Sequence, residues 1–409
     1  MDAIKSSATS LLSSANDALQ SALASSNRAG AASNHAQSLE KELEIKQILI
    51  HPIKSCRGTS VQQTEYDHSG LKFDRTWLII DAETRRFYTA RELPKMVLIH
   101  PRIDTERNIL SIEIPPTETG APGATIETTL EPTQQWLDQC ELIDDITIWV
   151  HKVNGYAVSQ EADEKLSAYF GKPVRLVRKG PSPRPSGPTD VNGPKEWQES
   201  TVRYQDFYPC TVASAASLRH VQKTLAASVY PSLQPSSEQG TEAQDSSESR
   251  DVHSYKVPAS VNREYWTPEE LETLPITRFR PNIIVHTLPG STGPELVPWE
   301  EDGWKAAEFF HPSSGDKPPM GAEAEGKGRG LYILEKCARC MVPNIDPETG
   351  VRDNFLPYRV LQQYRQVDPK NAVKGKPCFG MLSVPRETSG VLRVGDIMRI
   401  TKTVDPSTR

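Results

Sequence analysis

The sequence lacks a long apolar run and has no excess of basic residues. A helix that crosses a membrane needs about 20 mainly apolar residues. No such run occurs among the 409 residues, so we expect no transmembrane helix. The 47 Lys and Arg residues are outnumbered by 53 Asp and Glu residues, which gives a net charge of −6. A surface that binds nucleic acid through excess positive charge is therefore not expected.

Cysteine and phenylalanine are also scarce. Six scattered cysteines are too few for a disulfide framework, which indicates a reducing compartment. The glycines do not form a Rossmann dinucleotide-binding motif, so nothing suggests that the chain has its own NADH site. There are 9 phenylalanines against 33 prolines, and only 36% of the residues are apolar. This balance predicts β-rich domains joined by long polar loops.

Two stretches have too few apolar residues to pack. Residues 1–43 are dominated by Ser and Ala, with apolar residues at helical spacing opposite a Ser-rich face. We interpret them as a disordered leader or a weakly amphipathic helix, whose contact with a membrane surface would be weak. Residues 231–261 are rich in Ser, Gln and Glu, and there we expect a disordered low-complexity insertion.

Short alternating segments in the first half of the chain predict strands. The first strand begins at residue 44 and breaks at Pro52. The turn residues between the segments recur at a regular spacing, which indicates an antiparallel sheet or barrel rather than a βαβ fold. The further strands are expected at residues 73–81, 87–89, 97–103, 109–114 and 126–130.

The second half mixes helices and strands. A helix is expected at residues 160–172, ending at Gly171, and another is expected to begin near Ser214 after a strand and turn. Further elements are a strand at 174–180, a short helix at 358–366, and closing strands at 378–382 and 391–400.

An apolar segment, residues 331–336, runs directly into Cys337-Ala338-Arg339-Cys340. Pro, Asn, Asp and Gly follow, so we expect a strand that ends in a turn-rich loop. Binding and catalytic groups are often presented at such positions.

Residue types alone leave four interpretations of this Cys-x-x-Cys motif. A zinc site would need a second pair of Cys or His ligands, and the other four cysteines are solitary. A thioredoxin-type pair would precede a helix, which Pro343 argues against. One thiolate could bind a heavy metal while Arg339 holds an anionic group of its cofactor. Alternatively, both cysteines are structural.

Basic and hydroxylic residues stand next to several strands of the first half. Arginine binds phosphate through two parallel hydrogen bonds, lysine acts as a point charge, and Ser or Thr adds directed hydrogen bonds. The pattern suits an anionic, phosphorylated ligand, although surface strands often carry solvated charges of this kind. These residues are Lys54, Ser55, Arg57, Arg75, Thr89 and Arg91.

A second pair of arginines precedes the apolar segment IIVH. Arg278 and Arg280 are two residues apart, so in an extended strand they would share a face opposite Phe279. Spacing alone therefore does not choose between them as ligand-binding residues.

These motifs together resemble those of the MOSC domain family. In the second half they are CARCMVPNIDPETG from residue 337, YRQVDP at 364–369 and VGD at 394–396. In the first half HPIKSCRG, DRTW and TARELP occur in the order found in the MOSC N-terminal β-barrel domain. The whole pattern is similar to that of the mitochondrial amidoxime-reducing components.

The resemblance implies a mainly β fold with some α, built from two β-barrel domains. The MOSC N-terminal β-barrel domain would span residues 44–178. The MOSC domain would span residues 179–402 and contain the insertion at 231–261, and residues 403–409 would form a tail.

The resemblance also implies a molybdenum-molybdopterin cofactor. Cys340, the second cysteine of its motif, would be the catalytic residue and the molybdenum ligand. The lysine–serine pair and the arginine of the Asp-Arg dipeptide would contact the cofactor, and they correspond to Lys54, Ser55 and Arg75. In the pattern FRPN the arginine binds the cofactor, which gives this role to Arg280, with Asn282 close behind.

Other candidates rest on residue type or on position. We add Thr89, Arg91 and Arg339 as cofactor-binding donors. Hydroxylic residues precede the proline of the family's next motif, where this chain has Phe207 and Tyr208, and of these we keep Tyr208. Two further positions are interpreted differently: Leu382 replaces a tyrosine that lies near the cofactor in the family, and Arg278 is expected to be a solvated charge.

The activity implied by the resemblance is a two-electron reduction of N-hydroxylated substrates such as amidoximes and hydroxylamines, with nitrite as a related possibility. NADH, cytochrome b5 reductase and cytochrome b5 would supply the electrons, in a cytoplasmic or mitochondria-associated location. The alternatives are a sulfur carrier with a persulfide on Cys337 or Cys340, and a cofactor-storage protein. The sequence contains no PLP-binding desulfurase domain, which disfavours the carrier, although pyridoxal phosphate binding is a family-level possibility.

Overall fold

The computed structural model describes residues 41–117, 120, 122–187, 200–233, 252–312, 329–369, 375–387 and 389–408. The chain from Lys41 onward forms one compact unit. The predicted leader up to residue 40, residues 234–251 of the predicted insertion and most of the loop at 314–330 lie outside the described residues. Among the helices that the structure describes, none is long and apolar enough to cross a membrane.

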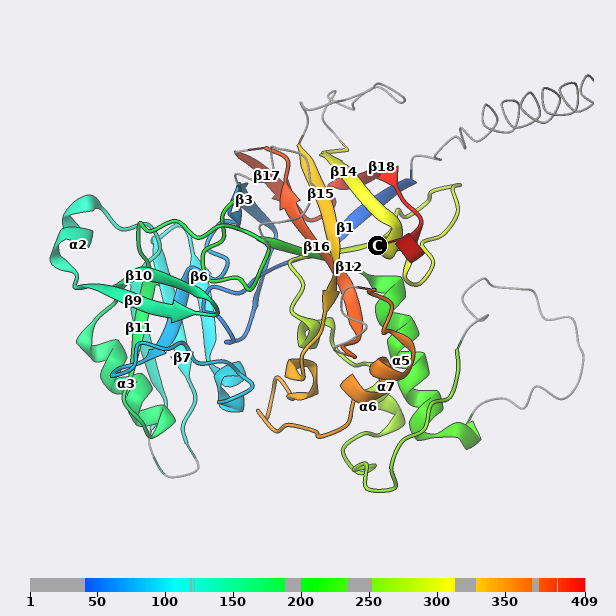
Figure 1. Ribbon diagram of the computed structural model, residues 1–409, viewed down its shortest axis with the longest axis horizontal. Coiled ribbons are helices and arrows are strands. Elements are labelled where there is room, and N and C mark those ends of the chain that lie inside the picture. The colour runs from blue at the N-terminus through cyan, green and yellow to red at the C-terminus, as the bar shows by residue number, and fades with distance from the viewer. Residues whose placement is uncertain are drawn as a thin grey trace, which may run out of the picture. The chain divides into compact units, whose positions relative to one another are not determined.

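Seven strands close into a β-barrel (Figure 1). Their order is β13-β12-β16-β15-β14-β18-β1, and the pairing of β1 with β13 closes the barrel. Neighbouring strands are antiparallel except β12 and β13, which are parallel. The strands are β1 (Lys41–Ile50), β12 (Cys210–Ser214), β13 (Ile283–Thr287), β14 (Trp304–Phe310), β15 (Gly330–Ala338), β16 (Cys378–Pro385) and β18 (Ile397–Thr403).

Alternate side chains of the barrel strands belong to two different apolar cores. Successive side chains of a strand point to opposite faces. On β12, Val212 is therefore buried in one core, whereas its neighbour Ala213 is buried in another. The first core also contains Ile45, Ile333 and Met398, all 0% exposed.

Helices cover the second core. A parallel strand pair needs a long crossover, and the chain between β12 and β13 contains α5 (Ala215–Val229) and α6 (Pro268–Glu272). α5 begins where the sequence predicts it, because the Ser214 hydroxyl accepts a hydrogen bond from the amide of Ser217 at 2.9 Å. Leu225 of α5 and Leu361 of α7 (Tyr358–Tyr364) belong to the second core.

The remaining strands form three smaller sheets with the orders β5-β11-β10-β9, β6-β7-β8 and β17-β3-β4, and β2 extends the barrel sheet beside β1. The helix α3 (Gln160–Phe170) ends at Gly171, whose φ of 69° is the left-handed conformation that glycine adopts readily. The bounds are β2 (Thr59–Val61), β3 (Gln63–Asp67), β4 (Gly70–Leu71), β5 (Trp77–Asp81), β6 (His100–Asp104), β7 (Ile109–Ile114), β8 (Ala124–Thr129), α2 (Gln134–Gln139), β9 (Leu142–Ile148), β10 (His151–Ala157), β11 (Val174–Lys179) and β17 (Ser389–Arg393).

The prediction of a mainly β chain with a barrel is confirmed. Strand pairing crosses the predicted boundary between residues 178 and 179 in two places. β1 is a barrel strand, and it begins at Lys41, three residues before the predicted strand start at residue 44. β17 pairs with β3 in a separate sheet. The domain limits given by the sequence motifs stay a prediction.

Several predicted elements differ from those in the structure. The strand expected at 73–81 begins only at Trp77, because Phe73 and Arg75 have left-handed φ values of 67° and 45°. The strand expected at 97–103 starts at His100, because Val97 belongs to a 3-10 helix, Pro94–Leu98, with proline in its first turn. At 87–89, only Phe87 makes a bridge, with Ile80.

The end of the expected disordered insertion is ordered. Tyr255 stacks on Tyr364 with 5.0 Å between ring centroids, and Val261 is 6% exposed. The prediction of disorder is therefore wrong for residues 252–261, because their few large side chains pack on the helices.

Phe379 joins the barrel to its helical cover, and its replacement tests this junction. The ring is 1% exposed and lies 4.0 Å from the Phe279 ring, centroid to centroid. We expect Phe379→Ala to lower the free energy of unfolding by about 3–5 kcal/mol, measured by urea denaturation. The control Val351→Ala, at a side chain that is 66% exposed, should change it by less than about 0.5 kcal/mol. Equal losses in the two variants would contradict this view of the junction.

Candidate functional site

The Cys-x-x-Cys motif lies at the end of a strand, as predicted. β15 ends at Ala338, and the amide of Arg339 donates to the carbonyl of Pro377 at 2.8 Å. Cys337 and Cys340 are both partly exposed free thiols. The Arg339 guanidinium donates from Nη1 to Cys337 Sγ at 2.9 Å and from Nη2 to the carbonyl of Phe279 at 2.5 Å. Arg339 therefore connects the motif to the segment that carries Arg280.

The loop after the motif is held by Arg278, which the sequence interpretation placed in solvent. Arg278 is 4% exposed, forms an ion pair with Asp346 at 3.0 Å and donates to the carbonyl of Ile345 at 3.1 Å. Asp346 in turn accepts hydrogen bonds from the amides of Glu348 and Thr349. The interpretation of Arg278 as a solvated charge is wrong, because residues 276–279 form a 3-10 helix and not an extended strand.

Arg75 occupies the centre of a buried polar network. Its Nη1 donates to both Asp74 carboxylate oxygens at 2.7 and 2.6 Å and lies 3.3 Å from Asn282 Oδ1. Its Nη2 donates to the carbonyl of Arg280 at 3.2 Å. Asn282 is 1% exposed and also bonds the backbone of β1 and β12, through Leu49 and Thr211. In this arrangement Asn282 positions Arg75, and any contact of its own with a cofactor stays a prediction.

Arg280 carries a positive charge that the described residues leave without an ion-pair partner. Its Nη1 donates to the carbonyl of Cys56 at 2.6 Å, whereas its Nη2 is buried and has no hydrogen-bond partner. Burial, with the charge of Arg75 as the next cause, lowers the pKa of Arg280 to about 9. A buried charge of this kind is unfavourable unless an anion pairs with it.

Lys54 is 7% exposed and bonds the carbonyl of Tyr204 at 2.8 Å as well as the Asp206 carboxylate. Asp206 also accepts from the indole nitrogen of Trp149 at 3.1 Å. Ser55, next to Lys54, has a left-handed φ of 70°. Burial lowers the pKa of Lys54, and Asp206 partly offsets this effect.

Thr89 and Arg91 lie at the edge of the same network. The Thr89 hydroxyl bonds Glu92 at 3.0 Å. The guanidinium carbon of Arg91 lies 5.3 Å from the centroid of the Trp149 ring, which Asp206 links to Lys54. The carbonyl of Arg91 accepts from Arg352, in the segment that follows the Cys-x-x-Cys loop.

Tyr208, a predicted cofactor-binding residue, lies in an apolar cluster. Its side chain is 3% exposed and packs with Val384, Tyr332 and Leu382. Two of the three positions at which the sequence departs from the family's pattern, Tyr208 and Leu382, therefore lie in one apolar cluster, whereas the third, Phe207, is exposed. A role of Tyr208 in cofactor binding stays a prediction.

Four residues that support the site were missed in the sequence. Asp74 adjoins Arg75, and Asp206 adjoins Phe207, so both stand next to positions that were singled out. Trp149 lies far from every motif, at the turn between β9 and β10, and has a left-handed φ of 53°. Arg278 was noticed but misread. Only Asp74 had a usable signal, namely an acidic residue beside a candidate cation, Arg75.

The charges of the network suit an anion. Lys54, Arg75, Arg280 and Arg339 are cationic, whereas two carboxylates, Asp74 and Asp206, pair with two of them. Two buried guanidinium atoms, Arg280 Nη2 and Arg339 Nε, have no hydrogen-bond partner in the described part of the chain. Guanidinium groups match phosphate geometry well. The donors that remain therefore fit a phosphorylated group.

A metal held by protein ligands alone is not supported in the described ranges. They contain no group of three or more His, Cys, Asp or Glu residues placed to hold a metal ion. A zinc site at Cys337 and Cys340 would need such a group. A metal at a single thiolate would need its remaining ligands from a cofactor.

Comparisons with known proteins agree with this architecture. The model of the MOSC N-terminal beta barrel domain matches residues 42–173, and that of the MOSC domain matches residues 252–399. The chain therefore contains a MOSC N-terminal β-barrel domain followed by a MOSC domain.

Curated relatives span most of the chain at low identity. Mitochondrial amidoxime reducing component 2 of Rattus norvegicus is 27% identical, over 90% of this chain and 86% of that protein. Mitochondrial amidoxime-reducing component 1 of Homo sapiens is also 27% identical, over 86% of this chain and 81% of that protein. Molybdenum cofactor sulfurase of Solanum lycopersicum is 24% identical over 85% of this chain, but over only 35% of that longer protein.

Acid titration tests the Asp74–Arg75 pair. Burial alone would raise the pKa of Asp74, but Arg75 and His51 outweigh it and lower the pKa from 3.8 to about 2. A carboxyl with a lowered folded pKa stabilises the protein above its unfolded pKa, and this contribution is lost as the pH falls through the folded pKa. We expect the free energy of unfolding to drop between about pH 4 and pH 2, and to drop less in Asp74→Asn.

Denaturant titrations at several pH values measure how steeply the free energy of unfolding falls with pH. Asp144→Asn, at an exposed aspartate, is the control and should keep the wild-type slope. A wild-type slope in Asp74→Asn would show that this carboxyl is not the titrating group.

Proposed function

We propose that the chain binds the molybdenum-molybdopterin cofactor and reduces N-hydroxylated substrates such as amidoximes and hydroxylamines. The observation that carries the proposal is the group of arginines beside the Cys-x-x-Cys motif, with guanidinium donors that the described residues do not use. The names of the relatives, amidoxime-reducing components and molybdenum cofactor sulfurase, support the same cofactor and reaction.

In this proposal the chain's residues bind and orient the cofactor. Cys340 would offer a thiolate, a soft ligand suited to a heavy metal. Arg280 and Arg339 would place their unused N–H groups on the anionic part of the cofactor. Arg75 would help to position Arg280, since its guanidinium donates to Asp74 and to the carbonyl of Arg280. When bound, the cofactor would supply a two-electron redox centre.

The reaction balances as a reduction. An N-hydroxylated substrate takes up two electrons and two protons, the N–O bond breaks, and the products are the N–H compound and water. We propose cytochrome b5 and NADH-cytochrome b5 reductase as the electron donors, which the resemblance to the amidoxime-reducing components implies. The sequence has no dinucleotide-binding glycine motif that would suggest an NADH site of its own. Nitrite is a second candidate substrate for the same centre. A mitochondria-associated location fits the names of the relatives.

One observation favours a second function, that of a sulfur carrier. The Arg339 guanidinium donates a hydrogen bond to the Cys337 sulfur at 2.9 Å, and the side chain of Cys337 is partly exposed. In this second candidate the Cys337 sulfur would carry the persulfide. This candidate predicts sulfane sulfur on Cys337, whereas the reductase predicts metal at Cys340.

Metal content separates the two candidates. We expect wild-type protein from a cofactor-competent host to contain nearly one molybdenum and one pterin per chain, by elemental analysis and pterin fluorescence. Cys340→Ala should lose the metal, because its thiolate ligand is removed. Cys337→Ala, the matched control in the same motif, should retain it. Metal-free wild-type protein with sulfane sulfur on Cys337 would refute the reductase and favour the carrier.

Arg280→Gln tests the anion-binding role separately from the fold. The Arg280 side chain is charged, partly buried and without an ion-pair partner in the described residues. We therefore expect the cofactor-free variant to unfold at the same denaturant concentration as wild type, or a higher one. Its pterin content should fall about tenfold, which corresponds to the loss of about 1.4 kcal/mol of binding. A large loss of stability with normal pterin content would give Arg280 a purely structural role.

A further inference from the structure

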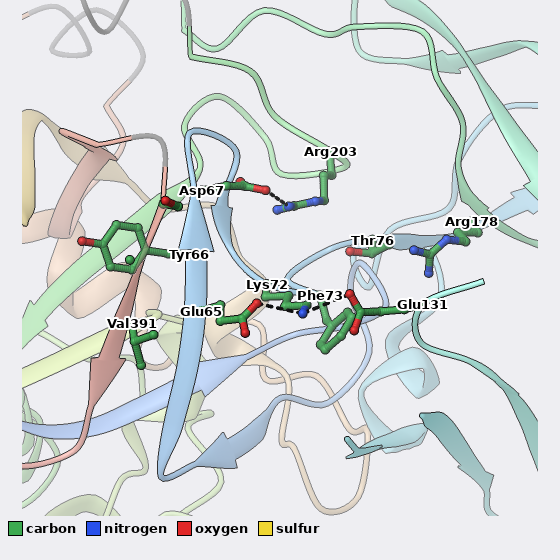
Figure 2. Close-up of a pocket in the computed structure, with 12 residues that line it drawn as sticks. Glu65, Tyr66, Asp67, Lys72, Phe73, Thr76, Glu131, Arg178, Arg203 and Val391 are labelled. Carbon is green, nitrogen blue, oxygen red and sulfur yellow. Dashed lines mark hydrogen bonds and ion pairs between the residues drawn. The ribbon is translucent and has the colours of Figure 1, made fainter. Parts of the chain in front are cut away.

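A cavity of about 590 Å³ is lined by none of the predicted site residues (Figure 2). Its walls come from β3 and β17 and from the residues Lys72, Phe73, Thr76, Glu131, Arg178 and Arg203. Its volume lies in the range of pockets that hold small organic molecules, about 300–1,000 Å³.

The acidic side chains of this cavity already have cationic partners. Lys72 pairs with Glu65 at 2.8 Å and with Glu131 at 3.0 Å. Arg203 pairs with Asp67 at 2.7 Å. Figure 2 shows these ion pairs on the cavity wall. They leave Arg178 as the remaining charged residue of the lining.

Arg178 has no carboxylate partner among the described residues. Its Nη1 donates to the carbonyl of Leu130 at 2.7 Å, and its guanidinium carbon lies 5.0 Å from the centroid of the Trp77 ring. Burial, followed by the charge of Arg203, lowers the pKa of Arg178 to about 10. A guanidinium has five N–H donors, so most of its donor capacity is not used by Leu130.

Thr76 adds an unpartnered polar atom to the lining of the same cavity. Its side chain is 5% exposed, lines the cavity, and its hydroxyl has no hydrogen-bond partner in the part of the chain that the structure describes. A buried hydroxyl without a partner costs stability. The pairing of β5 with β11 holds the two residues together, since Trp77 is opposite Arg178 and Lys179 donates to the Thr76 carbonyl at 2.9 Å.

We propose that this cavity binds a small organic carboxylate. The carboxylate accepts hydrogen bonds from Arg178 and from the Thr76 hydroxyl, and the apolar body of the ligand packs against the Phe73 ring. A monoanion fits better than a phosphate dianion, because Glu65, Asp67 and Glu131 also line the cavity and repel additional negative charge.

The cavity shares one turn with the candidate cofactor site. Phe73 and Thr76 line the cavity, whereas Asp74 and Arg75, between them, belong to the polar network. A ligand in the cavity therefore touches the turn that places Arg75. The binding proposal itself does not depend on the cofactor or on the reductase activity.

Calorimetric titration of the full chain with benzoate tests the proposal. We expect saturable binding, about tenfold weaker in Thr76→Val, which corresponds to about 1.4 kcal/mol. Because the hydroxyl has no partner and valine has the same shape, this variant should be at least as stable as wild type. Arg178→Lys keeps the charge but loses the paired N–H donors of the guanidinium, and should also weaken binding. Arg107→Lys, at a side chain that is 63% exposed, is the matched control and should bind as wild type does.

The neutral analogue benzyl alcohol and inorganic phosphate complete the test. We expect no saturable binding of benzyl alcohol and weaker binding of phosphate than of benzoate. Benzoate binding that is unchanged in Thr76→Val would overturn the site. Equal affinity for benzyl alcohol would refute the anion contact, and equal affinity for phosphate would refute the carboxylate preference. If Arg178→Lys does not fold, the Thr76→Val result decides.

Discussion

Positive charge that the protein leaves partly unneutralised is the constraint on which the candidate site depends. Asp74 pairs with Arg75, and Asp206 pairs with Lys54. Among the described residues, Arg280 and Arg339 have only carbonyl and thiol partners. Holding guanidinium groups close together away from water is unfavourable without an anion. The barrel and the Phe73–Thr76 turn nevertheless keep them in place through backbone contacts. This is the arrangement expected where ligand binding, rather than stability, sets the residue type.

The backbone around the candidate site is also in unfavourable conformations, which lowers the stability of the protein further. Ser55, Phe73, Arg75 and Arg280 have φ values of 70°, 67°, 45° and 53°, a region that costs residues other than glycine about 1–3 kcal/mol each. In the network, the carbonyl of Arg280 receives Arg75, and the carbonyl of Cys56, next to Ser55, receives Arg280. The left-handed residues thus turn carbonyls toward guanidinium groups. Regular strands through these positions would direct those carbonyls into the ladder instead.

Local sequence patterns predicted the strand and the helix near the candidate site better than they predicted the residues that support the site. The strand that ends before Arg339 and the helix that begins at Ser214 follow from local patterns, and both occur. Arg278 was misread because periodicity assumes an extended segment, whereas a 3-10 helix turns that side chain into the protein. Trp149 could not be found, because its link to Lys54 runs through Asp206, 57 residues away in the chain. Contacts between residues so far apart in the sequence leave no local sequence pattern.

The two cysteines of the motif are held differently, and this difference bears on their chemistry. Cys337 lies within β15, between residues whose partners on β16 are fixed by the ladder, Lys336 with Met381 and Ala338 with Cys378. Its sulfur also accepts from Arg339. Cys340 lies two residues beyond the strand, just before the loop that Arg278 and Asp346 hold. The direction of a side chain within a strand is fixed by the alternation of the strand, whereas a thiolate that binds a metal has to point toward that metal. Because Arg278 contacts the carbonyls of Pro343 and Ile345, it holds the loop that begins three residues after Cys340, and so supports the segment that carries this cysteine.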